Sequence, residues 1–472
     1  MATSIINRHH VSALALVILF CVPVGCGGSA PGDRGRDAAA TGPGPTALDS
    51  SALAIRVREE FVHAWNGYKT YAWGKDDLLP VSRTGRNWHG HTLYMTPVDA
   101  LDTMILMGLD EEAATTREFL AGNLSFDLDI EVKNFEITIR ILGGLLSAYQ
   151  MSQDRRLLAL AEDLGDRLLP VFESPTGMPY MYVNLKTGRV REPRSNPAEI
   201  GTLILEFGTL SRLTGRSVFF DKAKRALVAL HERRAQTDLV GEGIDVETGG
   251  WVSTESHVGG GIDSYYEYLL KCERLFGDPE CGAMWRRSIA AANSHLAAED
   301  PQGRLWYGAS EMATGRTISA TYGALHAFLP AVLALGGDLD RARRLQDSGF
   351  RMWTLHGIEP EVIDYRKMEV VSPGYQLRPE FAESTYYLHR LTGDARYLEM
   401  GRVILNDLVT HCRVDAGYTV LESVVTKEKG DYQHSFFLAE TLKYLYLLFA
   451  PDTLDFEGVV FNTEAHPLRR SW

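Results

Sequence analysis

The chain has 472 residues, of which 45% are hydrophobic and 23% charged, a composition that allows a large buried core and excludes a disordered or collagen-like chain. Its formal net charge is -13, and its Lys and Arg residues do not gather into a basic face, which argues against a nucleic-acid partner. We therefore expect neutral polyols or cations as ligands.

The first 25 residues have the pattern of a secretory signal. Arg8 and two histidines precede an apolar run that is too short for a stable membrane anchor, and small residues follow it. Residues 26–48 are rich in Gly, Ala, Pro and Asp and lack apolar periodicity, which predicts a flexible linker. Gly25-Cys26 is similar to a bacterial lipoprotein processing site. We therefore expect export to the periplasm or the outer cell surface with a lipid anchor at Cys26, and the alternative is simple cleavage and secretion.

Residues 49–472 repeat one pattern, in which two amphipathic stretches are joined by a short turn. Five of the turns contain Asp154, Arg216, Asp278, Asp338 and Asp394, at intervals of 56 to 62 residues. Apolar residues recur at three and four positions on both arms, which predicts helical hairpins. With residues 51–68 and 435–449 the chain has about fourteen helices in seven pairs, and short strand-like patches lie between them.

The final stretch is as apolar as the others, and no polar capping repeat is present. This favours a closed barrel over an open solenoid. We therefore predict an all-α fold, an (α/α)7 barrel of seven helical hairpins with short β-hairpins in its loops.

Three cysteines remain beyond the signal region. Cys272 and Cys281 flank the turn GDPE at a spacing that two antiparallel helices could bridge. Export would permit such a disulfide, and the alternative is three unpaired thiols including Cys412.

A polar residue stands at or near the start of the first helix in each unit. These residues are Asp99, Glu136, Glu199, Asp263, His326, Glu380 with Glu383, and Glu440. Because the inner helices of a closed barrel run parallel, we expect a ring of these groups at one end of the bore. Helix capping explains Asp99 and Glu199, but it explains the pair Glu380 and Glu383 poorly. Converging carboxylates are costly unless substrate, water or a cation uses them.

Carboxylates with nearby aromatic rings and guanidinium groups are typical of a sugar site. Phe436 could stack on a sugar ring, while Arg140 and Arg378 would orient carboxylates or hydroxyls. Two separated carboxyls can hydrolyse a glycosidic bond. The helix N-terminus should favour an ionised Glu380. A sugar epimerase would instead need a histidine-based proton shuttle, and the ring contains only His326.

The sequence contains, in this order, FEITIRILGGLLSAY, SPTGMPYMYVNLKTG, NPAEIGTLILEFGTLSRLTG, DSYYEYLLK, LRPEFAESTYYLHRLTGDARY, SFFLAETLKYLYLLF and VFNTEAHPL. These segments extend over roughly residues 55–468 and resemble class I α-mannosidases, glycoside hydrolase family 47, of which the chain is identified as a bacterial member. The resemblance implies an (α/α)7 barrel, a bound Ca²⁺ ion, and hydrolysis of terminal α-1,2-linked mannose with inversion. The expected substrates are mannose-rich N-glycans or related oligosaccharides.

The resemblance also implies roles for individual residues. Glu136 and Asp263 would be the acid-side carboxylates, with Glu136 acting through a water as the first choice, and Glu380 would be the general base. Thr463 would be the only direct protein ligand of Ca²⁺, through its hydroxyl and carbonyl oxygens, with waters and two substrate hydroxyls completing the shell. The residues expected around the sugar and the waters of the cation are Arg140, Glu199, His326, Arg378, Glu383, Phe436, Glu440 and Glu464.

Two positions depart from the family pattern. Gly261 and Ile262 stand where the best-known processing members have an arginine and a small residue. This difference resembles the degradation-enhancing subgroup of the family. It leaves open which arm of the glycan the protein would select. His434 stands where a glutamate usually precedes the serine. This difference leaves open a second hypothesis for the function, namely a non-catalytic or weakly active protein that binds mannose-containing glycans. We expect the protein to be a monomer. We expect it to associate with a membrane only through the lipid anchor at Cys26.

Overall fold

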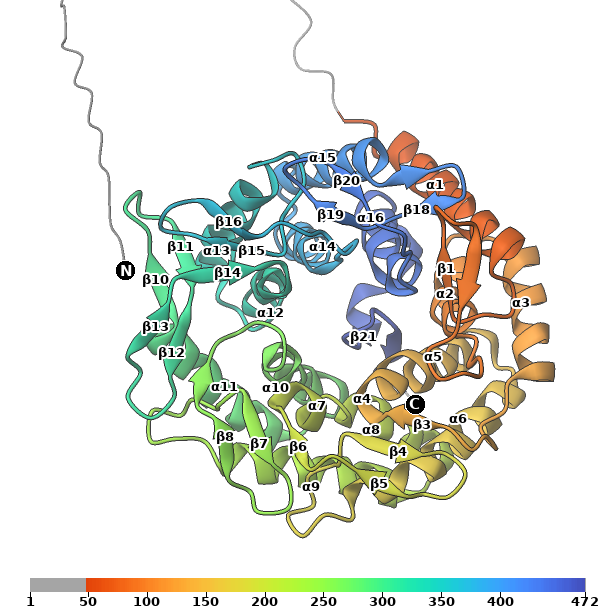
Figure 1. The fold of residues 1–472 in the computed structure, drawn as a ribbon, viewed down its shortest axis with the longest axis horizontal. Coiled ribbons are helices and arrows are strands. Elements are labelled where there is room, and N and C mark those ends of the chain that lie inside the picture. Colours follow the sequence, from red (N-terminus) through yellow and green to blue (C-terminus); the bar gives the residue numbers. More distant parts are fainter. Residues whose placement is uncertain (1–47, 472) are drawn as a thin grey trace, which may run out of the picture. The chain divides into compact units, whose positions relative to one another are not determined.

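The computed structural model describes residues 48–471, so the predicted signal and all but the last residue of the predicted linker lie outside the described residues. Within residues 48–471, fourteen helical units form two concentric rings of seven, an (α/α)7 barrel (Figure 1). The predicted fold is confirmed. No helix in this part of the chain is long and apolar enough to cross a membrane.

The inner ring consists of seven units, several of which change helix type along their length. They are α2 (Met95–Leu106), α4 (Asn134–Ile137) with η1 (Thr138–Leu142) and α5 (Gly143–Ser152), α7 (Pro197–Gly201) with α8 (Ile204–Thr214), α10 (Asp263–Phe276), η3 (Ala324–Phe328) with α12 (Leu329–Leu335), α14 (Glu380–Thr392), and η4 (Phe437–Thr441) with α16 (Leu442–Phe449). The ring closes because α16 packs against α14 and η4 packs against α2.

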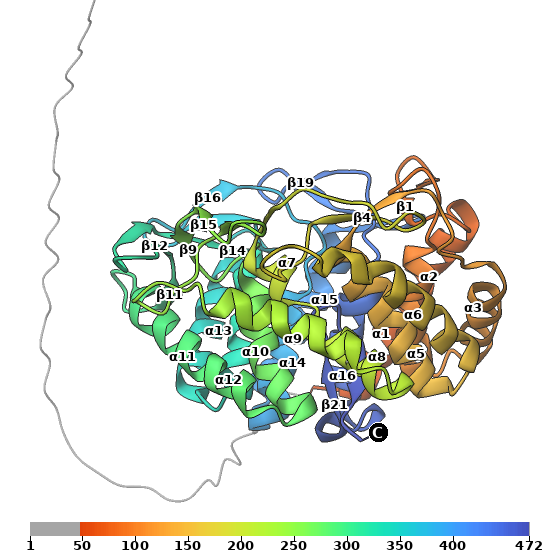
Figure 2. The same ribbon diagram turned by 90° about the horizontal axis from the view of Figure 1, so that it is seen from below.

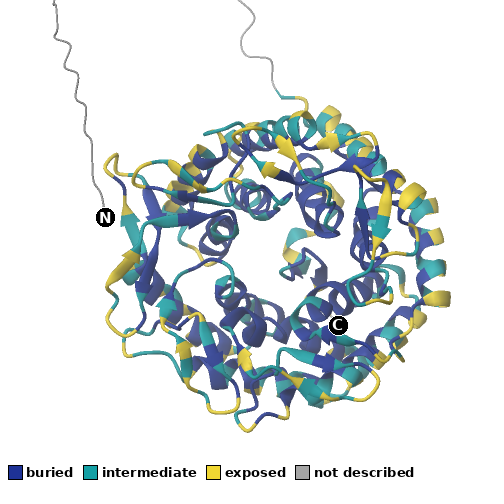
Figure 3. Cartoon of the chain, viewed as in Figure 1, coloured by how far each residue is buried: buried dark blue, intermediate teal, exposed yellow. Residues whose placement is uncertain are grey.

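The outer ring covers the inner one. It comprises α1 (Ser50–Tyr71), α3 (Asp110–Asn123), α6 (Arg155–Leu168) with η2 (Leu169–Phe172), α9 (Ser217–His231), α11 (Pro279–His295), α13 (Leu339–Trp353) and α15 (Arg396–His411). The first helix, α1, pairs with the last inner helix, α16, so the two ends of the described chain complete the seventh pair. Exposed residues lie mainly on the outer helices and the loops, whereas the inner ring is buried (Figure 3).

The predicted turns join the helices of each hairpin, and their residues explain where the helices begin and end. The side chains of Asp154, Asp278 and Asp338 accept hydrogen bonds from backbone N–H groups in the first turns of α6, α11 and α13. Gly277 and Gly393 end α10 and α14 with positive φ angles of 69° and 68°, a conformation that glycine adopts without steric cost. The repeat seen in the sequence is therefore one of capped helical hairpins.

Short antiparallel strands connect the units. In the described residues they form nine small sheets: β1 (Asp77–Leu79) and β2 (Thr84–Arg86); β3 (Glu131–Lys133), β4 (Tyr182–Asn184) and β5 (Val190–Arg191); β6 (Arg194–Ser195), β7 (Gly243–Asp245) and β8 (Trp251–Ser253); β9 (Glu255–Ser256), β12 (Ala309–Glu311) and β13 (Thr317–Ser319); β10 (Ala297–Glu299) and β11 (Leu305–Tyr307); β14 (Thr321–Gly323), β15 (Val362–Asp364) and β16 (Glu369–Ser372); β17 (Arg413–Val414) and β18 (Gly417–Tyr418); β19 (Leu421–Ser423) and β20 (Glu428–Lys429); β21 (Val459–Phe461) and β22 (Pro467–Arg469). Two 3₁₀ turns, η5 (Pro451–Thr453) and η6 (Phe456–Gly458), precede β21.

The last hairpin lies at the opposite end of the barrel from the other labelled hairpins. In Figure 2, β1, β4, β15, β16 and β19 lie at the upper end and β21 at the lower end. The turn between β21 and β22 packs closely on α5, because a Cβ atom at Gly143 would lie 2.6 Å from Asn462 Nδ2. The two glycines at the start of α5, Gly143 and Gly144, therefore let this hairpin pack closely on that helix, inside the ring of inner helices (Figure 1). We call β21, β22 and the turn between them the plug hairpin.

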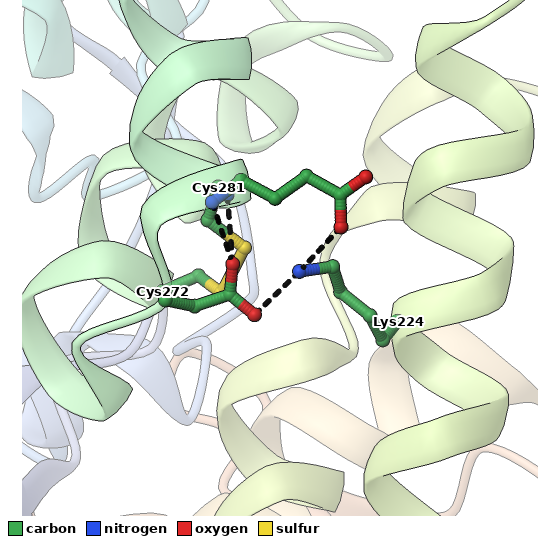
Figure 4. Close-up of a disulfide and its surroundings, with 5 residues drawn as sticks. Lys224, Cys272 and Cys281 are labelled. Atoms are coloured by element: carbon green, nitrogen blue, oxygen red, sulfur yellow. Dashed lines mark hydrogen bonds and ion pairs between the residues drawn. A yellow bond between two sulfur atoms is a disulfide. The ribbon is translucent and has the colours of Figure 1, made fainter.

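One disulfide links an inner helix to its outer partner. Cys272 in α10 and Cys281 in α11 are bonded, with their Cα atoms 5.9 Å apart, and both side chains are buried (Figure 4). Beside them, Asp278 caps α11 and pairs with Lys224 of α9 at 2.5 Å. Of the two alternatives that the sequence left open, the structure has the bridge, and Cys412 is a buried free thiol.

Candidate functional site

A cavity of about 300 Å³ lies where the inner helices begin. Polar and charged side chains dominate its lining: Lys133, Glu136, Arg140, Asn196, Glu199, Asp263, Ser264, Arg378, Glu380, Glu440, Thr463 and Glu464, with Phe135 and Phe436 as aromatic members. A second cavity of about 40 Å³ shares Asp263, Glu380, Glu440 and Thr463 with it and adds Glu267 and Glu383. The structure thus brings six of the eight predicted ring residues together at one end of the bore, namely Glu136, Glu199, Asp263, Glu380, Glu383 and Glu440.

Two of the predicted ring residues, Asp99 and His326, line neither cavity. Asp99 is fully buried, with its Oδ2 3.8 Å from Arg140 Nη1. His326 lies in η3. Its Nδ1 accepts a hydrogen bond of 3.2 Å from the Gly323 N–H, and its ring packs against Tyr322 and His257. Burial lowers the pKa of His326 to about 3, so the imidazole is neutral. The structure therefore gives His326 a capping role, and its contact with substrate stays a prediction.

Arg140 ties two parts of the chain together in the cavity wall. It lies in the π-helical turn η1, where its Nη2 is 3.0 Å from Glu136 Oε2 and its Nη1 contacts Glu464 on the plug hairpin. Burial raises the pKa of Glu464 to about 8, although the Arg140 charge opposes this rise. Arg140 therefore contacts one carboxylate in α4 and one in the turn between β21 and β22, and so joins these two parts of the cavity wall.

Arg378 is held by a carboxylate that the sequence analysis did not single out. Its Nη2 lies 3.0 Å from Glu361 Oε2, and its Nε lies 3.2 Å from both oxygens of Glu361. Glu361 precedes β15, in a segment without helical periodicity, so only its place one residue before a strand could have drawn attention to it. The fork-like contact fixes the guanidinium beside the start of α14.

Glu380 is the first residue of α14, and its Oε2 is buried without a hydrogen-bond partner. Burial raises the pKa of Glu380 to about 7, while the Arg378 charge opposes the rise. A backbone hydrogen bond at the helix N-terminus does favour the ionised form, as expected, but desolvation outweighs it and the net pKa is raised. An orphaned carboxylate oxygen in a cavity is an acceptor available to a bound ligand.

Three further carboxyls of the two cavities, Asp263, Glu383 and Glu440, also have a raised pKa. Burial raises the pKa of Asp263 to about 7, against hydrogen bonds from Ser264, and that of Glu383 to about 8, against the Lys271 charge. The pKa of Glu440 is raised by burial and then by Glu464. These shifts have one physical cause, since several acids are crowded into a volume with little water.

Glu267, which lines the smaller cavity, forms an ion pair with Lys271, and both side chains are nearly inaccessible to solvent. Lys271 Nζ also lies 3.8 Å from Glu383 Oε1. The sequence did contain a signal for them, because Asp263, Glu267 and Lys271 are four residues apart and lie on one face of α10.

Thr463 reaches the cavities on the turn of the plug hairpin. Its backbone N–H donates to Tyr268 Oη at 3.2 Å, and Asn462 Oδ1 accepts from the N–H groups of Glu464 and His466. Among the described residues, neither the hydroxyl nor the carbonyl oxygen of Thr463 has a hydrogen-bond partner. Two free threonine oxygens facing a set of carboxylates form an oxygen-only donor set, which fits Ca²⁺.

Buried ion pairs with the inner helices hold this hairpin in place. Lys443 Nζ and His466 Nδ1 each lie 2.7 Å from Asp102, and all three side chains are fully buried. Burial alone would lower the pKa of His466, but Asp102 raises it to about 9. Charged His466 therefore fixes the turn that presents Thr463.

His434, the unexplained departure from the family pattern, lies behind the cavity wall. Its ring stacks on Phe436 with centroids 4.5 Å apart and planes at 10°, and its Nε2 is 3.2 Å from Gln376 Oε1. Burial and then the Arg378 charge hold the pKa of His434 well below its usual range. A neutral His434 thus supports Phe436, and it does not replace a group of the cavity lining.

Residues 60–470 match the family model described as glycosyl hydrolase family 47. The chain is 40% identical over 447 residues to the endoplasmic reticulum mannosyl-oligosaccharide 1,2-alpha-mannosidase of Rattus norvegicus, covering 87% of this chain and 67% of that protein. It is 37% identical over 465 residues to ER degradation-enhancing alpha-mannosidase-like protein 2 of Mus musculus, covering 91% and 80%. The solved structure of an alpha-1,2-mannosidase from Trichoderma reesei is similar, with a TM-score of 0.83, 28% identity, and coverage of 89% of this chain and 99% of that one.

Proposed function

Because the chain belongs to glycosyl hydrolase family 47, we propose that it is a calcium-dependent, inverting exo-α-1,2-mannosidase that acts on mannose-rich N-glycans or related oligosaccharides. The observation that carries the proposal is the cavity in which Glu136, Asp263 and Glu380 meet the free oxygens of Thr463. The turn between β21 and β22, which carries Thr463, lines both cavities, so the terminal sugar would meet this turn.

In the proposed reaction, ionised Glu380 takes a proton from a water, and the oxygen of that water attacks the anomeric carbon. The bond from that carbon to the glycosidic oxygen breaks. The leaving oxygen receives a proton from Glu136 through a second water, with Asp263 as the other candidate acid. Arg378 lies in the cavity wall beside the base and would orient Glu380, and Arg140 holds Glu136 in place. Attack from the face opposite the leaving group gives inversion.

Thr463 would hold Ca²⁺ through its hydroxyl and carbonyl oxygens, and Glu383, Glu440 and Glu464 would accept hydrogen bonds from the waters of the ion. When bound, the ion supplies positive charge that offsets the crowded carboxylates and fixes two hydroxyls of the sugar. Phe436, supported by His434, would stack on the sugar ring.

The second hypothesis is a glycan-binding protein without turnover. The position of His434 behind Phe436 removes the main reason for it, because no carboxylate of the proposed mechanism is replaced. Release of mannose from α-1,2-mannobiose, measured with and without a calcium chelator, tests the choice. Binding of the disaccharide without any release would favour the binding protein.

Bacterial origin, export, the lipid anchor at Cys26 and the monomeric state remain predictions. The signal and the anchor lie outside the described residues. The disulfide between Cys272 and Cys281 supports an oxidising compartment, since such bonds persist outside the reducing cytosol.

Gly261 leaves an open space in the cavity wall. Its φ angle is 91°, and a Cβ atom at this position would have only Asn196 Cγ and Glu242 Cγ nearby, both at 3.9 Å. Ile262 is fully buried and lines no part of the cavity, so it does not fill the gap. Position 261 therefore supplies no long donor side chain that could select one glycan branch.

We expect the protein to remove α-1,2-linked mannose from several branches of a nine-mannose glycan at comparable rates. The measurement is a time course in which the products are resolved by isomer. Accumulation of a single eight-mannose isomer, with the other branches intact, would contradict this expectation. The native protein is the right material for the test, because an arginine placed at residue 261 would strain a backbone with positive φ.

A further inference from the structure

Lys133 lines the cavity but is absent from the residues that the sequence indicated. It is the last residue of β3, directly before α4, and its Nζ lies 2.5 Å from Glu199 Oε1 and 3.9 Å from Glu136 Oε1. Its side chain is 31% exposed, compared with 11% for Arg140 and 22% for Arg378, the other two cations of the lining. Lys133 is thus the most accessible positive charge in the cavity wall.

Lys133 also has unused hydrogen-bonding capacity. An ammonium group has three N–H donors, of which Glu199 takes one, while Glu136 is too distant for a hydrogen bond. The two guanidinium groups differ, because carboxylates hold Arg140 at both Glu136 and Glu464 and hold Arg378 at Glu361. Lys133 therefore has two donors left for a ligand, on the most exposed of the three cations of the lining.

Its partner Glu199 offers the complementary acceptor. The residue is only 5% exposed, its Oε1 faces Lys133, and its Oε2 is buried without a hydrogen-bond partner. Burial raises the pKa of Glu199, whereas the Lys133 charge opposes the rise. A donor and an acceptor held side by side match two neighbouring hydroxyls of a sugar, which can accept and donate in turn.

The place of this pair in the cavity indicates which sugar it meets. Lys133 and Glu199 line only the larger cavity, whereas Asp263, Glu380 and Thr463 also line the smaller cavity that contains Glu383. Lys133 pairs across the sheet with Tyr182 of β4, at the end of the barrel that carries most of the loops (Figure 2). Next to it, the Ala198 N–H donates to the Gly261 carbonyl, so the wall continues into the open space at Gly261.

We propose that Lys133, together with Glu199, binds two neighbouring hydroxyls of the leaving-group sugar and thereby favours a polyol leaving group. The inference rests on the proposed function, and it adds a residue that determines which substrates are cleaved efficiently. Charge-assisted hydrogen bonds of this kind are stronger than neutral ones, so their loss should be measurable.

The test compares two substrates in the Lys133→Met variant, which keeps the apolar stem and removes the charge. The kcat/KM for α-1,2-mannobiose should fall by about 10- to 100-fold, the effect of losing a charged hydrogen bond. The kcat/KM for α-mannosyl fluoride, whose leaving group has no hydroxyls, should stay within about threefold. Lys133→Arg should recover most of the loss. Lys222→Met, which removes an ion pair with Glu173 on the outer surface, should leave both substrates unaffected.

An equal loss on both substrates, or no loss on the disaccharide, would overturn the proposal. So would a loss that disappears in a Glu199→Gln background, because Lys133 would then act only by neutralising Glu199. If the wild-type protein hydrolyses neither substrate, the proposed function fails on its own. The Lys133 contact is then decided by calorimetric binding of α-1,2-mannobiose to Glu380→Gln, where an unchanged Kd on adding Lys133→Met would refute it.

Discussion

Replacing Glu380 with glutamine should lower kcat for α-1,2-mannobiose by about 10²- to 10⁴-fold, the usual contribution of a general base. The amide keeps the shape of the side chain at the start of α14 but cannot take a proton from the attacking water. Steady-state kinetics at saturating Ca²⁺ provide the measurement. The control is Glu173→Gln, which removes an exposed carboxylate paired with Lys222 and should retain full activity. Near-normal turnover in Glu380→Gln would remove this residue from the mechanism.

The same variant should be as stable as the wild type or more stable. Burial raises the pKa of Glu380 from 4.5 to about 7, so the folded state resists ionisation of this carboxyl. The ionised form therefore destabilises the fold progressively as the pH rises through this range, and the cost is complete above pH 7. We expect the Tm of chelated Glu380→Gln to exceed that of the chelated wild type at pH 8 and to equal it near pH 4. A lower Tm at pH 8 would mean that Glu380 stabilises the fold.

Removal of Ca²⁺ should abolish most of the activity and lower the Tm. A ligand that binds only the folded state stabilises it by mass action, by about 2.7 kcal/mol at 100 times its Kd. Chelation followed by thermal unfolding and by the mannobiose assay gives both readouts. Added Ca²⁺ should restore them, and Mg²⁺ should do so poorly, because it requires a smaller octahedral shell.

Thr463→Val links this effect to the plug hairpin. The variant loses the hydroxyl and keeps the carbonyl, so more Ca²⁺ should be needed to restore the Tm. Thr410→Val, which changes an exposed threonine on α15 that bonds only within its own helix, is the matched control. Full activity in thoroughly chelated wild-type protein would contradict the calcium proposal.

The sequence predicted the barrel because each hairpin repeats the same apolar spacing and the same turn. The acidic ring followed from that repeat, since inner helices that run parallel place their first residues at one end of the bore. His326 shows where the argument stops. Its unit begins with the 3₁₀ helix η3, whose different number of residues per turn changes the direction of the side chain, so equal spacing along the chain did not give an equal position in the ring.

Two of the missed residues, Lys133 and Glu361, lie where no periodicity constrains the chain. Lys133 ends a three-residue strand, and Glu361 precedes another, so neither belonged to a helical pattern. Their partners Glu199 and Arg378 were predicted, but an ion pair between units cannot be read from the spacing within a unit. Thr463 was found through the family resemblance alone, because its two free oxygens depend on a hairpin that enters from the other end of the barrel.

The most direct test of the central claim is ¹H NMR of the first mannose released from α-1,2-mannobiose by the calcium-loaded protein. An inverting reaction with Glu380 as base requires that the β anomer form first and then equilibrate slowly by mutarotation. Spectra recorded within the first minutes should therefore show β-mannose in excess. Initial α-mannose, or no mannose at all, would contradict the proposed mechanism.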